Sequence, residues 1–282
     1  MSLVNYQNPS VFITGASSGI GYYCAIALKN EGYNVVASCR RQEDVEHLRA
    51  EGIHCLQMDL ADSDSIQRAV KEFFILSEGK IYALFNNGAY GQPGAVEDLS
   101  RDALRKQFET NLFGWCELTN LLLPTMLQQG YGRIIQNSSV LGFAAMPFRG
   151  AYVASKFALE GISDTLRLEL KGTGVFVSLI EPGPIRSLFR KNALQALRDN
   201  VDIAKSRHAQ QYQTAIARLQ KTGDAAKFTL NPDAVCSKLL HALKAKSPRT
   251  RYKVTVPTHV FALLKRVASD KWLDRILSKV SA

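Results

Sequence analysis

Short apolar runs rich in β-branched and aromatic residues recur along the chain, and most are followed by a segment with helical spacing of apolar positions. The runs occupy 10–15, 34–40, 54–60, 82–89, 133–139, 175–183 and 252–257. The helical patterns occupy 19–31, 43–51, 63–77, 100–128 and 151–171. This alternation predicts an α/β fold in three layers, in which helices cover both faces of a Rossmann-type, doubly wound parallel sheet of about seven strands. In such a single domain the site lies at the carboxyl ends of the strands.

Two segments extend beyond this frame. Residues 188–230 follow the sixth run and have mostly helical patterning, so we expect a substrate lid there. Five large apolar side chains of this segment either line an apolar substrate pocket or pack the lid onto the sheet. They are Leu188, Phe189, Leu194, Leu197 and Tyr212.

The second segment is an amphipathic tail, residues 258–282, whose apolar positions fall at helical spacing. They are Val260, Leu263, Leu264, Val267, Leu273, Ile276, Leu277 and Val280, and they alternate with basic residues. Two alternatives stay open for this stripe. It packs onto the domain or onto a second subunit, or it lies on an anionic membrane surface.

Composition narrows the class of protein. The chain has 282 residues, of which 46% are hydrophobic and 21% charged, as is usual for a globular protein with a large core. No apolar run is long enough for a membrane span, and the first residues lack a signal-peptide pattern. The five cysteines are scattered and odd in number, which indicates reduced thiols. We therefore expect a cytoplasmic protein, with peripheral membrane contact through the tail left open, and no metal site.

The positive charge is concentrated in the last third of the chain. Residues 186–282 carry 20 Lys and Arg against 6 Asp and Glu, whereas residues 1–185 carry 15 against 19. A basic region of this kind suits nucleic acid, an anionic cofactor or a membrane surface. No nucleic-acid reader motif accompanies it, so we expect no nucleic-acid partner.

A glycine-rich turn, "TGASSGIG", joins the first run to the first helix. Its glycines, Gly15, Gly19 and Gly21, permit a tight turn, a close approach of the backbone and close helix–sheet packing. Such a turn suits a pyrophosphate at the helix N-terminus. The alternative is a glycine-rich turn that binds no ligand, which would have the same sequence. The second run ends in Cys39, Arg40 and Arg41, with no carboxylate to bind a ribose 2′-hydroxyl. A guanidinium binds a 2′-phosphate, so this pair favours NADP(H) unless it is merely solvated.

Tyr152 and Lys156 lie four residues apart on a predicted helix and therefore share a face. An ammonium group near the phenol would lower the pKa of the tyrosine from about 10. Tyr152 is thus a candidate proton donor to a carbonyl that is being reduced. A single pair of this type is also expected by chance.

Together these motifs resemble the classical short-chain dehydrogenases/reductases. "TGASSGIG", "DL" at 59–60, "NNGA" at 86–89, Asn111, "NSS" at 137–139, "YVASK" at 152–156 and "PGPIRS" at 182–187 occur in that family's order and spacing. The resemblance covers about residues 10–190 and is closest to hydroxysteroid and retinol dehydrogenases and to bacterial NADP-dependent aldehyde reductases. "NNGA" departs from the common "NNAG", and Ser187 replaces the usual threonine of the last motif.

The resemblance implies roles for the matching positions. Tyr152 would be the general acid/base, Lys156 would lower its pKa and hold the nicotinamide ribose, and Ser139 would bind the substrate oxygen. Asn111 would anchor a water that relays protons to Lys156. The remaining positions would contact the cofactor: Gly15, Ser17, Ser18, Gly19, Ile20, Gly21, Arg40, Arg41, Asp59, Leu60, Asn86, Asn87, Gly88, Pro182, Gly183, Ile185 and Ser187.

We therefore expect an NADP(H)-dependent oxidoreductase that interconverts an apolar, lipid-like or steroid-like carbonyl with its alcohol. The family resemblance also implies a homodimer or homotetramer. The alternative is a protein that binds NADP as a sensor or scaffold without catalysis. Proteins of that kind typically lose the tyrosine or the lysine, and both are present here.

Overall fold

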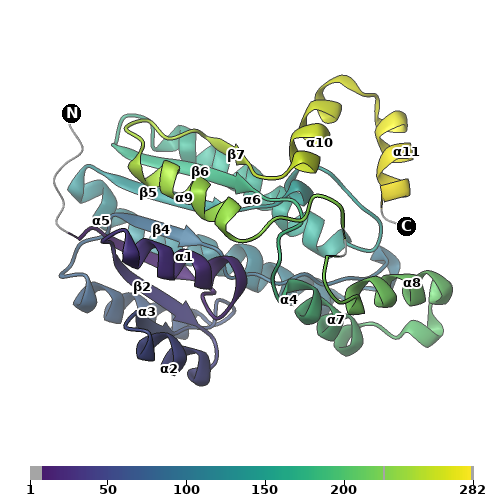
Figure 1. Ribbon diagram of the computed structural model, residues 1–282, viewed down its shortest axis with the longest axis horizontal. Helices are drawn as coiled ribbons and strands as arrows, with labels where there is room; N and C mark the ends of the chain where they lie inside the picture. Colours follow the sequence, from purple (N-terminus) through teal and green to yellow (C-terminus); the bar gives the residue numbers. More distant parts are fainter. Residues whose placement is uncertain (1–7, 225, 281–282) are drawn as a thin grey trace.

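A single parallel sheet organises the computed structural model, which describes residues 8–224 and 226–280 (Figure 1). Its seven strands run in the order β3-β2-β1-β4-β5-β6-β7, and every neighbouring pair is parallel. The strands are β1 (Ser10–Thr14), β2 (Asn34–Cys39), β3 (His54–Gln57), β4 (Ala83–Asn86), β5 (Gly132–Asn137), β6 (Val175–Glu181) and β7 (Arg251–Lys253). The predicted doubly wound fold is confirmed.

The central strands are continuous apolar runs because helices cover both faces of the sheet. Every residue of β1 and of β5 is buried. One face packs against α1 (Gly19–Asn30), α2 (Gln42–Ala50) and α9 (Asp233–Lys244). The other face packs against α3 (Ser63–Leu76), α5 (Gly114–Gln129) and α6 (Gly150–Glu169).

The predicted helix at 100–128 is interrupted. α4 (Arg101–Phe108) leads into a π-helical turn, Glu109–Phe113, before α5 begins. A π-helical turn adds one residue to a helical turn, and such turns are frequent at functional sites. The continuous apolar spacing of this region did not reveal it.

The segment 188–230 forms α7 (Phe189–Asn200), a 3₁₀ turn (Ile203–Lys205) and α8 (Ala209–Gln220). Leu197 and Tyr212 are fully buried in a cluster that joins this segment to α4 and α6. The Tyr212 hydroxyl donates to Asp98 at 2.7 Å and accepts from the Ala95 amide at 2.8 Å. These two side chains therefore pack the segment onto the domain and do not line a pocket.

The tail begins earlier than expected, because β7 ends at Lys253 and α10 (Val256–Val267) follows almost directly. The chain is extended at Ala268, and α11 (Asp270–Val280) then completes the tail. The predicted tail stripe does not form one face, since Leu264 and Leu277 pack inward while three members of the stripe are exposed. The exposed members are Val260, Leu263 and Val267, whereas the side chain of Val280 lies outside the described residues.

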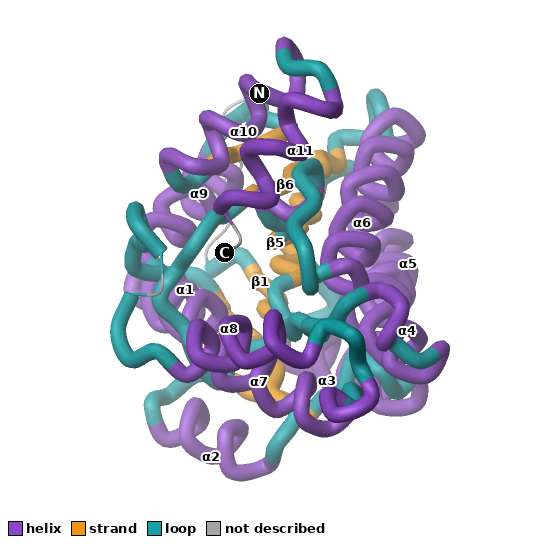
Figure 2. Tube along the Cα trace, turned by 90° about the vertical axis from the view of Figure 1, so that its right-hand side faces the viewer, coloured by secondary structure: helices purple, strands orange, loops and turns teal. Residues whose placement is uncertain are grey.

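The two segments lie on opposite sides of the strands' carboxyl ends. Figure 2 looks at this edge, with α7 and α8 below the strand ends and α10 and α11 above them. None of the helices among residues 8–224 and 226–280 is long and apolar enough to cross a membrane. The segment 188–230 and the tail thus lie on either side of the edge at which the site is expected.

Candidate active site

The glycine loop between β1 and α1 is packed too closely for side chains. Gly15 and Gly19 have φ angles of +66° and +58°, a conformation that favours glycine. A Cβ atom on Gly21 would lie 2.3 Å from the Gly15 carbonyl oxygen. The N-cap of α1, Ser18, makes no side-chain capping bond, and the first turn of α1 has no acidic residue. The start of α1 therefore fits a phosphate group.

Arg40 and Arg41, which follow β2, differ in their partners. Arg41 donates to Asp44 at 2.9 Å (Nε to Oδ2) and pairs with Glu43 at 2.8 Å. Arg40 is exposed, and its guanidinium makes no hydrogen bond or ion pair with the residues that the structure describes. Of the two predicted phosphate ligands, Arg40 is the one that remains available to an anion.

Four other predicted cofactor-binding residues, Ser17, Ile20, Asp59 and Leu60, follow β1 and β3 at the same edge of the sheet. Ser17 is exposed on the glycine loop, and Ile20 packs half-buried on the core below it. The Asp59 carboxylate accepts a hydrogen bond from the Ala61 amide at 2.9 Å, and Leu60 is buried beneath Gly88.

Three asparagines at the carboxyl ends of β4 and β5, Asn86, Asn87 and Asn137, hold neighbouring elements of the site together. Asn86 is fully buried and donates to Thr119 of α5 at 3.1 Å, whereas its side-chain oxygen has no hydrogen-bond partner among the described residues, and its predicted cofactor contact stays a prediction. Asn87 donates to the Thr14 carbonyl at 2.9 Å and accepts from Asn137 at 2.8 Å. No role was predicted for Asn137, although it opens the "NSS" motif, and it links the glycine loop to α6.

Ser139, Tyr152 and Lys156 meet where β5 ends and α6 begins. Ser139 caps a 3₁₀ turn (Val140–Gly142), where its hydroxyl accepts from the Leu141 amide at 3.1 Å, and it lies close enough to the Tyr152 hydroxyl to lower the pKa of that phenol. Lys156 is buried and donates to the Asn137 carbonyl at 2.8 Å. Its Nζ lies 4.2 Å from the ring centroid of Trp115 and 5.8 Å from that of Tyr152. No role was predicted for Trp115 from the sequence, although it lies four residues after Asn111 in the same helical region.

The pKa of Tyr152 is raised, whereas the sequence led us to expect that Lys156 would lower it. Burial raises the pKa of Tyr152 to about 12, and the nearby Ser139 hydroxyl offsets this only in part. Burial lowers the pKa of Lys156 to about 7, against a smaller opposing effect of Glu160. The ammonium group is directed at the Asn137 carbonyl, and desolvation outweighs any stabilisation of the phenolate. Tyr152 is therefore a protonated acid at neutral pH.

Asn111 lies in the π-helical turn and is fully buried. Its side chain donates to the Tyr90 carbonyl at 2.9 Å and accepts from the Tyr90 amide at 3.2 Å. Its Nδ2 is 3.4 Å from the hydroxyl of Ser155, next to Lys156 in the chain. Asn111 thus fixes the loop after β4 beside the site, and the predicted water relay stays a prediction.

The loop after β6 closes against the glycine loop. The Pro182 carbonyl accepts from the Val140 amide at 2.8 Å, and a Cβ atom on Gly19 would lie 2.8 Å from Ser187 Cβ. Ile185 pairs with Leu230 across an isolated bridge. Arg186 donates to Asp224 at 2.9 and 2.7 Å and so ties the loop to the far end of the 188–230 segment. A methyl group on Gly183 would meet Thr255 at 2.1 Å, so α10 supports this loop from outside.

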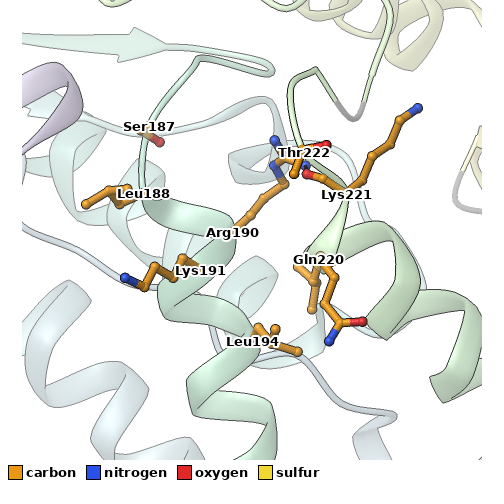
Figure 3. Close-up of a pocket in the computed structure, with 9 residues that line it drawn as sticks. Ser187, Leu188, Arg190, Lys191, Leu194, Gln220, Lys221 and Thr222 are labelled. Carbon is orange, nitrogen blue, oxygen red and sulfur yellow. Dashed lines mark hydrogen bonds between the residues drawn. The ribbon is translucent and has the colours of Figure 1, made fainter.

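Next to Ser187 lies an open cavity of about 540 Å³ between the start of α7 and the end of α8 (Figure 3). Its lining mixes apolar and cationic side chains: Ser187, Leu188, Arg190, Lys191, Leu194, Leu219, Gln220, Lys221 and Thr222. Phe189 points elsewhere, because its ring meets the Tyr152 ring at a centroid distance of 5.3 Å. Leu188 and Leu194 thus border a cavity, whereas Phe189 borders Tyr152.

The comparisons with known proteins agree with this geometry. The family model of short chain dehydrogenases matches residues 9–198. The uncharacterized oxidoreductase YbbO of Escherichia coli is 42% identical over 268 residues, which are 95% of this chain and 93% of that protein. The human 17-beta-hydroxysteroid dehydrogenase type 1 is 33% identical over 260 residues, covering 87% of this chain and 77% of that protein.

Two further matches extend over nearly the whole chain. The NADPH-dependent 3-dehydrocapnine reductase of Ornithobacterium rhinotracheale is 31% identical over 275 residues, 95% of either chain. The crystal structure of a short-chain dehydrogenase from Streptomyces avermitilis has a TM-score of 0.75 at 26% identity and covers 96% of this chain and 98% of its own. The chain therefore belongs to the short-chain dehydrogenases/reductases.

Proposed function

We propose that this oxidoreductase uses NADPH to reduce an apolar aldehyde or ketone to the alcohol. The observation that carries the proposal is the placement of Ser139 beside the Tyr152 hydroxyl, with Lys156 on the next turn of α6. The uncapped start of α1 and the unpaired Arg40 fit a phosphorylated dinucleotide. The NADPH dependence in the name of the Ornithobacterium relative supports the same choice. When bound, such a cofactor supplies the hydride.

The chain's own groups then hold the substrate and move one proton. Ser139 holds the carbonyl oxygen, and Tyr152 donates its phenolic proton to that oxygen. The phenol carries this proton at neutral pH, because burial raises the pKa of Tyr152 to about 12. Lys156 holds the nicotinamide ribose, and Asn111 with Tyr90 maintains the π-helical turn from which protons are resupplied.

The substrate proposal rests on the side chains around Tyr152. Phe189 covers its ring, and Val153, Phe143 and Met146 belong to the same apolar cluster. A lipid-like or steroid-like carbonyl suits these surroundings. In this proposal residues 188–230 are a lid that the Arg186–Asp224 pair holds beside the nicotinamide loop. The assembly is a homodimer or homotetramer, and light scattering distinguishes the two.

The proposed activity is tested with a panel of aldehydes and ketones of increasing apolar size, with NADPH as the reductant. We expect turnover that improves with chain length or ring number, measured as consumption of NADPH and formation of the alcohol. A panel that yields no alcohol while NADPH still binds would favour the sensor alternative instead.

Arg40→Ala is expected to weaken NADPH binding about 10–100-fold and to leave NADH binding nearly unchanged, because a charge-assisted bond to a phosphate contributes about 1.5–3 kcal/mol. Arg41→Ala is the matched control, since Arg41 is already paired with Asp44 and Glu43. Both affinities are measured by fluorescence titration of the full chain. Equal losses for the two cofactors, or a larger loss in the Arg41 variant, would contradict the assignment.

The pKa of Lys156, about 7, predicts a pH dependence of cofactor binding. The side chain is cationic below that pH and attracts an anionic dinucleotide, and it becomes neutral above it. The Kd for NADPH should therefore rise severalfold from about pH 6 to about pH 8.5. Lys156→Arg stays charged throughout and separates this effect from titration of the cofactor's phosphate. A wild-type profile that matches the Arg variant would argue against the shifted lysine.

A further inference from the structure

α10 has a second apolar face beyond the one that attaches it to the domain. Its inner face is fixed by Phe261, which packs with Val140 and Leu141. Lys265 adds a hydrogen bond to the Phe143 carbonyl at 2.6 Å and lies 4.7 Å above the Phe157 ring. The helix is therefore held in one orientation, and its other side is directed away from the domain.

That outer side carries a row of aliphatic residues, Val256, Val260, Leu263 and Val267, which we call the outer row. Their spacing of four, three and four residues places them on one face of the helix. They are 54, 46, 63 and 72% exposed. Trp272, at the start of α11, adds an aromatic side chain that is 49% exposed. Singly exposed apolar side chains are ordinary, but a row of four on a fixed helix indicates a binding surface.

The charges beside the outer row are cationic. Arg266 is exposed about 90° around α10 from the row, and Lys271 and Arg275 are exposed on α11. None of these three side chains forms an ion pair with a residue of the described chain. The acidic residues of the two helices, Asp270 and Asp274, are fewer than the basic ones. Aliphatic and tryptophan side chains flanked by free cations are the composition of an interfacial helix.

We propose that the outer face of α10, with the start of α11, docks onto an anionic membrane surface. A second copy of the chain fits less well, because a two-fold interface apposes the same patch and would bring these cations toward their own copies. Figure 1 shows α10 and α11 as a pair that projects beyond the edge of the sheet, which leaves their outer side accessible to a flat surface. The outer row enters the headgroup region, and Arg266, Lys271 and Arg275 meet the lipid phosphates.

The docking surface adjoins the catalytic side chains. Leu264, Leu273 and Ile276 of the two helices pack in the same cluster as Met146 and Tyr152. A membrane that holds the outer face therefore lies next to the wall of the substrate site, where an apolar carbonyl dissolved in lipid can enter. This consequence rests on the proposed function, whereas the docking itself does not.

The docking is tested by flotation of the full chain with vesicles of phosphatidylcholine alone or mixed with phosphatidylglycerol. We expect at least about fivefold more binding to the anionic vesicles, and loss of that binding at high salt. Leu263→Ser with Val267→Ser, or Arg266→Glu with Lys271→Glu, should each lower it about fivefold or more. Ile75→Ser with Val96→Ser, two residues elsewhere that are 77 and 71% exposed, is the matched control and should bind as the wild type does.

Three results overturn the docking. The first is wild-type protein that does not float with anionic vesicles, and the second is an outer-row variant that floats as well as the control. The third is a drop in molar mass of the outer-row variant by light scattering, which would make the row an interface between copies. Carbonyl reduction in detergent-free buffer is measured in parallel, so that a failure of the proposed function is separate from a failure of docking.

Discussion

Tyr152→Phe is expected to lower kcat for carbonyl reduction by about 10²–10⁴-fold, the usual contribution of a general acid. The substitution removes the phenolic proton but keeps the ring, whose edge contact with Phe189 at 5.3 Å is preserved. Binding of NADPH should therefore stay within about twofold of wild type. The measurement is steady-state reduction of the best aldehyde of the panel, with the cofactor affinity taken from a separate titration.

Tyr23→Phe is the matched control for this substitution, because Tyr23 is 43% exposed on α1 and loses the same hydroxyl. It should retain wild-type kcat. If Tyr152→Phe reduces the substrate at more than about a tenth of the wild-type rate, the proton comes from another group, and the role given to Tyr152 is wrong.

Arg251→Met is expected to lower the free energy of unfolding by about 3–5 kcal/mol, the usual effect of removing one partner from a buried ion pair. Arg251 contacts Glu160 at 3.0 Å, Asp164 at 2.7 Å and Glu181 at 3.1 Å. Glu160 and Glu181 are buried, so their carboxylates would lose their main compensation while remaining out of water. Denaturant unfolding of both proteins measures the difference.

The pH dependence of this loss is a further check. Burial already raises the pKa of Glu181 to about 7 and also raises that of Glu160. Below about pH 7 the Glu181 carboxyl becomes protonated and needs no cation, so the deficit of Arg251→Met should shrink at about pH 5 and be full at about pH 8. Arg41→Met, which breaks an exposed pair, should cost about 0–1 kcal/mol. Similar losses for the two variants would contradict the account of the cluster.

The sheet and the positions of the candidate catalytic side chains could be predicted because their signals are local. Continuous apolar runs such as β1 and β5 are typical of strands buried on both faces, and the glycine loop lies within eight residues. Tyr152 and Lys156 share one helix face. For each of these features, the chemistry and the spacing are fixed by neighbours in the sequence.

What could not be predicted depends on contacts between distant segments. The Glu160–Glu181–Arg251 cluster joins α6, β6 and β7, and no spacing rule brings those residues together. The direction of the pKa shifts at Tyr152 and Lys156 depends on burial, which the motif does not state. Leu197 and Leu188 look alike in the sequence, yet one anchors α7 and the other borders the cavity.

The tail illustrates a limit of helical periodicity. The spacing of its apolar residues correctly indicated helices, but it could not say which of two adjacent apolar faces meets the domain. Phe261 and Leu264 take the inner face because Val140 and Leu141 lie opposite them. This packing leaves Val260, Leu263 and Val267 exposed on the outer face of α10. The membrane proposal rests on that exposed apolar face.

The central claim is that Arg40 selects NADPH for carbonyl reduction at Tyr152. Its most direct measurement is the ratio of kcat/KM for NADPH to that for NADH, with one saturating aldehyde and the wild-type chain. The account predicts a ratio of at least about 10, since a single charge-assisted phosphate contact contributes that factor or more. A ratio near or below 1 would contradict it.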